Sequence, residues 1–348
     1  MTGPRAYLDW NATAPLRPEA REAAIRVLDL AGNPSSVHAE GRAARAAVER
    51  ARAQVAALVG ARPAEVVFTS GATEAAGVLS ALGAGWRVEV DPISHDCLVA
   101  HAREQDAPRT ARAWGLANNE TGRLSPAPAE AEASADLTLV DVAQLVGRLP
   151  FDFAASGADM AILSAHKLGG PKGVGALVVR EGLGPFLLRP GGGQEHGWRG
   201  GTEPVALIAG FGAAAEAAAA ERAAGAWAGV EKLRKILERT LSDEVPELII
   251  RDMERPRLPN TACVALPGWP AETQVMRLDL AGFAVSAGAA CSSGKVGPSR
   301  ALRAMGADEI TAGSAIRVSF GPTTPAAELE RFAETWIAAA RRRPARAA

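Results

Sequence analysis

The loop at residues 164–173 carries the side chain in this sequence most suited to covalent chemistry. It reads SAHKLGGPKG and follows an apolar run, residues 158–163, that predicts the end of a buried strand. The amine of Lys167 can form a Schiff base with an aldehyde, and pyridoxal phosphate is the biological aldehyde that uses one. A lone loop lysine is more often only solvated, but the neighbouring serine, histidine and glycines favour contacts with a phosphate and a ring. We therefore predict that Lys167 holds pyridoxal phosphate.

A carboxylate and an amide stand at the end of a second predicted strand. Residues 136–141 form a strand pattern that ends at Asp141, and Gln144 follows three residues later. Ligands of open α/β sheets lie at the carboxyl ends of the strands. Asp141 can pair there with a protonated pyridine nitrogen, and Gln144 can donate to the phenolic oxygen of the ring. An isolated aspartate at a strand end more often caps a helix, but the lysine loop downstream favours the ring contact.

Two glycine-containing segments are candidates for holding the phosphate. Residues 70–74 read SGATE and join a strand to a helix, where free backbone N–H groups, the helix dipole and the Thr73 hydroxyl favour an anion. Residues 191–202 read GGGQEHGWRGGT, and their backbone amides together with Thr202 can cradle a phosphate. The alternatives are an ordinary capped helix for the first segment and a flexible connector for the second.

Two further side chains have a possible role beside the ring or the substrate. His95 lies just after a predicted strand, where an imidazole can stack on a planar ring and move protons near neutral pH. The alternative is a loop histidine with a satisfied hydrogen bond. Arg317 lies inside the predicted strand at residues 316–320, so it needs a partner when buried. That partner is either a substrate carboxylate or an internal ion pair, and the sequence leaves the two open.

The chain has three cysteines, Cys97, Cys263 and Cys291, which are widely spaced and form no C-x-x-C pair. Cys263 lies in an apolar strand pattern and is expected in the core. Cys291 lies in a small, polar loop, residues 286–295, where an exposed thiol is a hazard unless it is used. This loop has the wrong spacing for a nucleotide-binding P-loop, and Val296 stands where that motif requires Ser or Thr.

The composition excludes several classes of protein. With 48% hydrophobic and 22% charged residues and a net charge of −1, the chain is typical of a soluble globular protein and is not expected to bind nucleic acid or an anionic membrane. The N-terminus lacks an apolar signal core, and no membrane span is predicted. The three unpaired cysteines favour a reducing, cytoplasmic location.

Helix and strand patterns alternate along the first two thirds of the chain, which predicts a mostly parallel sheet covered on both faces. An Ala-rich helix over residues 205–241 is expected to lead into a second, smaller domain.

Taken together, these segments resemble the cysteine desulfurases, pyridoxal-phosphate enzymes of the class V aminotransferase group. The resemblance covers nearly the whole chain. The motifs that carry it are NPSSVH at residues 33–38, FTSGATE at 68–74, NNETG at 118–122, SAHK at 164–167 and GGGQE at 191–195.

The resemblance implies a fold type I aminotransferase-like α/β architecture. Its large pyridoxal-phosphate domain, expected at residues 14–242, has a mostly parallel, seven-stranded-type sheet covered by helices. The smaller α+β domain, expected to combine residues 1–13 and 243–348, carries the catalytic cysteine loop.

The resemblance also implies a set of cofactor contacts, in which Lys167 forms the Schiff base and His95 stacks on the ring. The full set is Ala72, Thr73, His95, Asp141, Gln144, Ser164, His166, Lys167 and, from a second subunit of a homodimer, Thr202.

The implied reaction removes sulfur from L-cysteine and leaves L-alanine. Asn119 and Arg317 are expected to bind the substrate carboxylate, and Cys291 to take the sulfur as a persulfide for an acceptor protein, either an iron–sulfur scaffold or another carrier. No metal site is predicted, although Cys291 is a candidate for a transient iron–sulfur ligand.

The sequence departs from the family pattern in two places. Trp10 and Ala14 replace the usual Asn and Thr, and the span between His95 and Asn119 is shorter, so that a helix and a strand are expected to be missing or reduced. Two alternatives stay open for this reason. One is a related class V lyase or aminotransferase acting on another amino acid, and the other is a non-catalytic partner in sulfur transfer.

Overall fold

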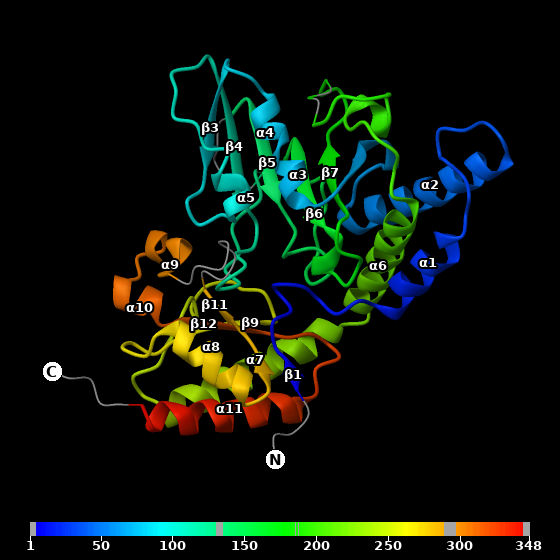
Figure 1. Ribbon diagram of the computed structural model, residues 1–348. Coiled ribbons are helices and arrows are strands. Elements are labelled where there is room, and N and C mark those ends of the chain that lie inside the picture. The colour runs from blue at the N-terminus through cyan, green and yellow to red at the C-terminus, as the bar shows by residue number, and fades with distance from the viewer. Residues whose placement is uncertain (1–4, 130–134, 185, 187, 289–296, 344–348) are drawn as a thin grey trace. The chain divides into compact units, whose positions relative to one another are not determined.

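The computed structural model describes residues 5–129, 135–184, 186, 188–288 and 297–343, which form two compact units (Figure 1). The larger unit comprises residues 13–117 and 125–224, and the smaller unit comprises residues 1–12, 118–124 and 225–348.

The larger unit is built on a six-stranded sheet of order β2-β7-β6-β5-β4-β3. The pairs β3–β4, β4–β5 and β5–β6 are parallel, and β7 runs antiparallel to both of its neighbours. The predicted mixed α/β class with a mostly parallel sheet is therefore confirmed. The strands are β2 (Val66–Thr69), β3 (Trp86–Val90), β4 (Arg109–Gly115), β5 (Leu137–Asp141), β6 (Met160–Ser164) and β7 (Gly175–Val179).

Helices cover both faces of this sheet because successive strand residues point to opposite sides. Val67 faces the core formed with α3 to α5, which also contains Leu79 and Leu98. Phe68, the next residue, packs edge-on against Phe211 of α6 on the other face, with 6.1 Å between ring centroids. The helices are α1 (Pro18–Leu28), α2 (Ala39–Val59), α3 (Ala72–Ala76), α4 (Val78–Ala81), α5 (Asp96–Val99) and α6 (Val205–Ala223), with 3₁₀ turns η1 (Pro63–Glu65), η2 (Ala165–Lys167) and η3 (Glu195–Gly197).

The sheet has six strands in the described residues, one fewer than the seven-stranded type that the resemblance implies, in agreement with the strand expected to be missing or reduced after His95. The sheet ends at β3, and the link from β3 to β4 contains only the four-residue helix α5. Val88 and Arg103 exchange two backbone hydrogen bonds of 3.1 and 3.0 Å, and the Gln105 amide donates to the carbonyls of Ala84 and Trp86. These contacts satisfy backbone groups on the edge of β3, where a seventh strand would have paired.

The smaller unit contains a four-stranded antiparallel sheet of order β11-β12-β9-β8 and a parallel pair, β1 with β10. It has the α+β character expected from the sequence. Its strands are β1 (Ala6–Tyr7), β8 (Ile249–Ile250), β9 (Thr261–Ala265), β10 (Phe283–Ala284), β11 (Ser286–Ala287) and β12 (Ala315–Ser319), and its helices are α7 (Ala226–Glu244), α8 (Ala271–Leu280), α9 (Arg300–Ala304), α10 (Glu309–Gly313) and α11 (Ala326–Arg341).

Aromatic residues of α11 hold the core of the smaller unit. Trp336 is fully buried, packs against Trp269 with 5.6 Å between centroids and the rings tilted by 38°, and donates its indole N–H to Gln274 Oε1 at 3.0 Å. Phe332, one turn earlier, packs edge-on against Phe283 of β10. A Trp whose N–H is satisfied can be buried without the cost of an unpaired donor.

The predicted helix over residues 205–241 is two helices. Gly225 lies between α6 and α7 with φ of +76°, in the left-handed region that interrupts a helix. α7 packs on α11, and residues 118–124 pair with the smaller unit through the Leu258 N–H to Gly122 carbonyl bond of 2.8 Å. Local contacts thus place residues 118–124 and 225–242 in the smaller unit, whereas the sequence analysis placed them in a large domain of residues 14–242. That the predicted limits mark independently folding domains remains a prediction.

Within the described residues, every helix falls short of the length and apolar character needed to cross a membrane.

We predict that Gly175→Ala destabilises the larger unit. A Cβ at this position would lie 2.6 Å from both the Cα of Gly71 and the carbonyl oxygen of Leu163, and neither backbone atom can rotate away. Overpacking of this kind lowers the free energy of unfolding by about 1–3 kcal/mol, measurable by urea denaturation. Gly85→Ala is the matched control, because a Cβ there meets nothing within 4 Å. Equal stability of the two variants would contradict the close approach of β7 to the turn after β2.

Candidate active site

The predicted cofactor residues of the larger unit come from the carboxyl ends of neighbouring strands. β5 ends at Asp141, and β6 ends at Ser164 and runs directly into η2, which ends at Lys167. In the strand register Asp141 lies opposite Ile162 of β6, two residues before Ser164. His95 follows β3 and caps α5, accepting the Cys97 N–H on Nδ1 at 3.1 Å. The parallel order of the strands therefore brings these separate segments to one edge of the sheet.

Asp141, His95 and Lys167 interact electrostatically. Removal from water raises the pKa of Asp141, and this is opposed by a 2.8 Å hydrogen bond from the Ala143 N–H and by the positive charges of His95 and Lys167. A carboxylate in such a place is stabilised by a further cation, because an opposite charge nearby favours its ionised form. A protonated pyridine nitrogen is a cation of this kind. The predicted grouping of Asp141, His95 and Lys167 is therefore present in the structure.

Gln144 is buried behind Asp141, and an arginine that the sequence analysis overlooked fixes its side chain. Arg148 Nη1 donates to Gln144 Oε1 at 2.7 Å and to the Gln144 carbonyl at 3.1 Å. The spacing of four residues was visible in the sequence, but nothing in the pattern showed that the two side chains meet inside the protein.

The turn after β2 lies close to the end of β6. Thr69 and Ser164 both lie opposite Gly175 in the register of β7, and a Cβ built on Gly71 would come 3.9 Å from Ser164 Oγ. Thr73 is exposed and Ala72 is partly exposed at the start of α3. The Ser164 hydroxyl and the backbone of residues 71–73 can therefore reach a common anion, as a phosphate site requires.

His166 supplies a direct test of whether the site fits pyridoxal phosphate. Its Nδ1 atom is buried and has no hydrogen-bond partner among the residues that the structure describes. Burial lowers the pKa of His166 to about 4, assisted by the charges of Lys167 and Lys172, so its imidazole is neutral at pH 7. A buried nitrogen without a partner next to two lysines fits an anionic oxygen, because a bound ligand would satisfy it. The residues present thus fit a phosphate-bearing aldehyde attached to Lys167.

Thr202 is exposed on the larger unit, and the loop before it is anchored by a buried ion pair. Glu195, with φ of +49°, receives two hydrogen bonds from Arg52 at 2.8 and 2.9 Å and one from the Phe68 N–H at 2.7 Å. Nearby, Arg199 Nε donates to Glu74 Oε1 at 2.9 Å, while the other oxygen of Glu74 accepts the Ser70 N–H. The glycine-rich loop is therefore fastened to β2 and to the turn at residues 70–74, and is more than a flexible connector.

In the smaller unit, Arg317 has an internal carboxylate partner. Its side chain is 2% exposed, Nη2 pairs with Asp9 Oδ1 at 2.7 Å, and Nη1 donates to the Asn119 carbonyl at 3.0 Å. Ser286 Oγ holds the other Asp9 oxygen at 2.8 Å. Of the two partners left open by the sequence, the structure contains the internal ion pair. Within the described part of the chain the Arg317 Nε is buried without a hydrogen-bond partner, and binding of a substrate carboxylate by Arg317 and Asn119 remains a prediction.

Cys291 lies outside the described residues. The segments on either side of residues 289–296 meet at Glu120, whose Oε2 accepts the Ser299 hydroxyl at 2.6 Å and lies 2.8 Å from the position of a Cβ on Gly288. The other two thiols are buried. Burial raises the pKa of Cys97, and it raises the pKa of Cys263 to about 12. Both are therefore weak nucleophiles.

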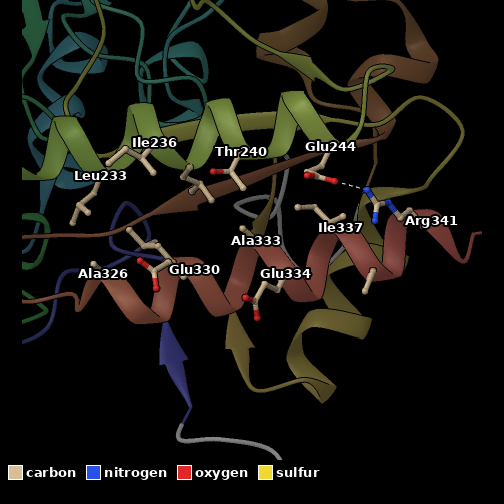
Figure 2. A pocket seen from close by; sticks show the side chains of 13 residues that line it. Leu233, Ile236, Thr240, Glu244, Ala326, Glu330, Ala333, Glu334, Ile337 and Arg341 are labelled. Atoms are coloured by element: carbon tan, nitrogen blue, oxygen red, sulfur yellow. Dashed lines mark hydrogen bonds and ion pairs between the residues drawn. The ribbon is translucent and has the colours of Figure 1, made fainter.

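No group of three or more His, Cys, Asp or Glu residues in the described part of the chain is arranged to hold a metal ion. A separate apolar groove lies between α7 and α11 of the smaller unit, with Glu244 and Arg341 paired across one end (Figure 2). Its lining contains Leu233, Ile236 and Ile337 and includes no predicted site residue.

Comparison with known proteins identifies the family. The sequence model for class V aminotransferases matches residues 6–107 and 112–332. A cysteine desulfurase from Cereibacter sphaeroides is 40% identical over 372 residues, which cover 95% of this chain and 94% of the relative. This chain belongs to the cysteine desulfurase family.

Two solved structures support the fold. The NifS-like protein from Rickettsia africae shares 29% identity and a TM-score of 0.86 over 95% of this chain and 98% of its own. SspA in complex with cysteine shares 27% identity and a TM-score of 0.73 over 92% of this chain and 100% of SspA. The chain is thus a fold type I pyridoxal-phosphate enzyme, and the predicted family, fold and cofactor are confirmed.

We predict that Glu195→Gln destabilises the protein, because it leaves the Arg52 guanidinium buried without its main carboxylate partner. Removing one member of a buried pair costs about 3–5 kcal/mol of unfolding free energy, measurable by urea denaturation. Glu181→Gln, which breaks an exposed ion pair with Arg62, serves as the control and is expected to cost less than about 1 kcal/mol. Similar losses in both variants would contradict an anchoring role for Glu195.

His166 makes the stability of the cofactor-free protein depend on pH. The pKa of His166 is about 4 in the folded protein and 6.5 in the unfolded chain. Between these two pH values the unfolded chain binds a proton on this imidazole and the folded chain does not. Stability is therefore lost as pH falls from 6.5 to about 4, by about 2 kcal/mol when partial exposure is allowed for.

Thermal denaturation of cofactor-free wild type, His166→Gln and His166→Asn between pH 4 and 7 measures this dependence. Both variants are expected to show a flatter fall than wild type. An unchanged slope in the two variants would show that His166 is not held neutral by the fold.

Proposed function

We propose that this protein removes the sulfur of L-cysteine, giving L-alanine and a persulfide on Cys291. The observation that carries the proposal is the meeting of Asp141, His95 and Lys167 at one sheet edge beside the unpartnered Nδ1 of His166. The cysteine bound to SspA and the desulfurase relatives support cysteine as the substrate.

The residues of the larger unit have separate tasks in this chemistry. Pyridoxal phosphate, when bound, supplies an aldehyde and a ring that accepts electron density from the α-carbon of an amino acid. Asp141 would stabilise a proton on the ring nitrogen, and His95 would lie against the ring. Lys167 would hold the cofactor, and its amine would also carry the α-proton of the substrate. Ser164, His166, Ala72 and Thr73 bind the phosphate.

We assign sulfur transfer to Cys291. The thiolate sulfur of Cys291 bonds to the substrate sulfur as the carbon–sulfur bond breaks, and the electron pair of that bond stays with carbon, which takes up a proton and leaves as alanine. Cys97 and Cys263 are poor candidates because burial raises the pKa of both thiols. The persulfide would then pass to an acceptor, either an iron–sulfur scaffold or another sulfur carrier.

We further infer a homodimer, because the exposed Thr202 is then available to complete the phosphate site of a second copy. A cytoplasmic location is also part of the proposal, supported by three cysteines that form no disulfide framework.

The test is cysteine turnover by the purified protein, measured as alanine, sulfide released by a reductant, and persulfide on the enzyme. Lys167→Ala is expected to lose at least about 100-fold in alanine formation, because both cofactor attachment and proton transfer depend on this amine. Cys291→Ser is expected to keep the absorbance of bound pyridoxal phosphate and to lose the persulfide.

Cys263→Ala is the control for Cys291→Ser and is expected to keep the persulfide, since this buried thiol has no role in the transfer. Full sulfide release by Cys291→Ser would overturn the assignment of Cys291. Turnover of other amino acids with no alanine from cysteine would favour a related class V lyase or aminotransferase.

A further inference from the structure

Arg148 lies behind the cofactor site and connects its two chain segments. Arg148 is buried, with only 3% of its surface exposed. Nη1 donates to Gln144 Oε1 at 2.7 Å and to the Gln144 carbonyl at 3.1 Å, while Nη2 donates a longer bond, 3.4 Å, to the Lys167 carbonyl. One guanidinium therefore contacts both the segment after β5 and the segment after β6.

The local turn is shaped to bring Arg148 back onto Gln144. The Val146 N–H bonds the Val142 carbonyl at 3.0 Å, and Gly147 follows with φ of +81°. A Cβ on Gly147 would lie 3.1 Å from the Cβ of Ala218 and 3.4 Å from that of Leu168, so the glycine also lets the turn close against α6 and the lysine loop.

The chemistry of the contact determines which end of the Gln144 amide points where. A guanidinium carries five donors and no acceptor, so the amide atom that faces it must be the carbonyl oxygen. With the oxygen held by Arg148, the NH2 group is directed to the other side as a donor. Without that contact, the two ends of a carboxamide are nearly equal in shape and can exchange places.

We propose that Arg148 is a positioning residue that fixes the Gln144 carboxamide with its NH2 group toward the phenolic oxygen of pyridoxal phosphate. This inference rests on the proposed function, because it uses the assignment of Gln144 to that oxygen. A donor aimed at the oxygen stabilises its anionic form, and a hydrogen bond to a charged group is stronger than one between neutral groups. The contact with the Lys167 carbonyl holds the lysine segment in register with the same amide.

The experiment compares Arg148→Met, which removes all donors but keeps a long apolar side chain, with Arg148→Lys, which keeps the positive charge. We measure the dissociation constant of pyridoxal phosphate and the pH at which the visible absorbance of the bound cofactor changes. Arg148→Met is expected to weaken binding about tenfold or more and to move that pH upward. Arg148→Lys is expected to show most of the same effect, because an ammonium lacks the rigid planar fork by which the guanidinium directs N–H groups at both Gln144 and the Lys167 carbonyl. Wild-type behaviour of Arg148→Lys would show that charge alone matters and would overturn the proposal.

A double-mutant cycle separates positioning from a merely structural role. In a Gln144→Ala background, Arg148→Met is expected to change cofactor binding less than about twofold, because the amide it orients is gone. The same tenfold loss of cofactor affinity in both backgrounds would show that Arg148 supports the local structure without orienting Gln144, and would overturn the proposal. The melting temperature of each cofactor-free variant identifies any loss that comes from unfolding.

These readouts are independent of cysteine turnover. A wild-type protein that binds pyridoxal phosphate but makes no alanine from cysteine would refute the proposed function, and the measurements on Arg148 would still decide whether it orients Gln144.

Discussion

The electrostatic balance around Asp141 is the interaction on which the rest of the larger unit's site depends. Removal from water raises the pKa of this carboxyl group, and the Ala143 N–H with the charges of His95 and Lys167 opposes that rise. An anion in such surroundings strongly favours a neighbouring cation. His95 follows β3, Asp141 ends β5 and Lys167 follows β6, so their meeting requires these strands to be parallel and in register. The sheet topology is thus what brings the three side chains together.

Three buried arginines hold segments that contain predicted site residues in place. Arg52 holds Glu195 in the glycine-rich loop, Arg148 holds Gln144, and Arg317 pairs with Asp9 in the smaller unit. All three side chains are buried, and each directs several N–H groups at fixed oxygens. A buried guanidinium is costly unless its donors are used, and using them restricts the chain on both sides of each contact. These ion pairs and hydrogen bonds therefore fix the positions of the chain segments more than they raise the net stability of the fold.

Burial lowers the reactivity of two of the three thiols of the chain, those of Cys97 and Cys263. Burial raises the pKa of Cys97 and Cys263, which removes them as competitors for sulfur transfer, although Cys97 lies beside His95 and Asp141. The loop of Cys291 is flanked by Gly288 and Ser299, which both approach Glu120. Neither of these two buried thiols is therefore suited to sulfur transfer, which is why the proposal assigns that step to Cys291.

The sequence by itself determined the family, the alternating helices and strands, and the loss of a strand after His95, because short motifs and local periodicity are properties of neighbouring residues. It also placed Asp141 and Ser164 at strand ends, which the structure bears out. Only the tertiary structure decided that Arg52 meets Glu195 across 143 positions, that Asp9 pairs with Arg317, and that Gly225 divides the Ala-rich helix. Such contacts depend on which elements pack together and how a buried charge finds an acceptor, and no local spacing encodes either choice.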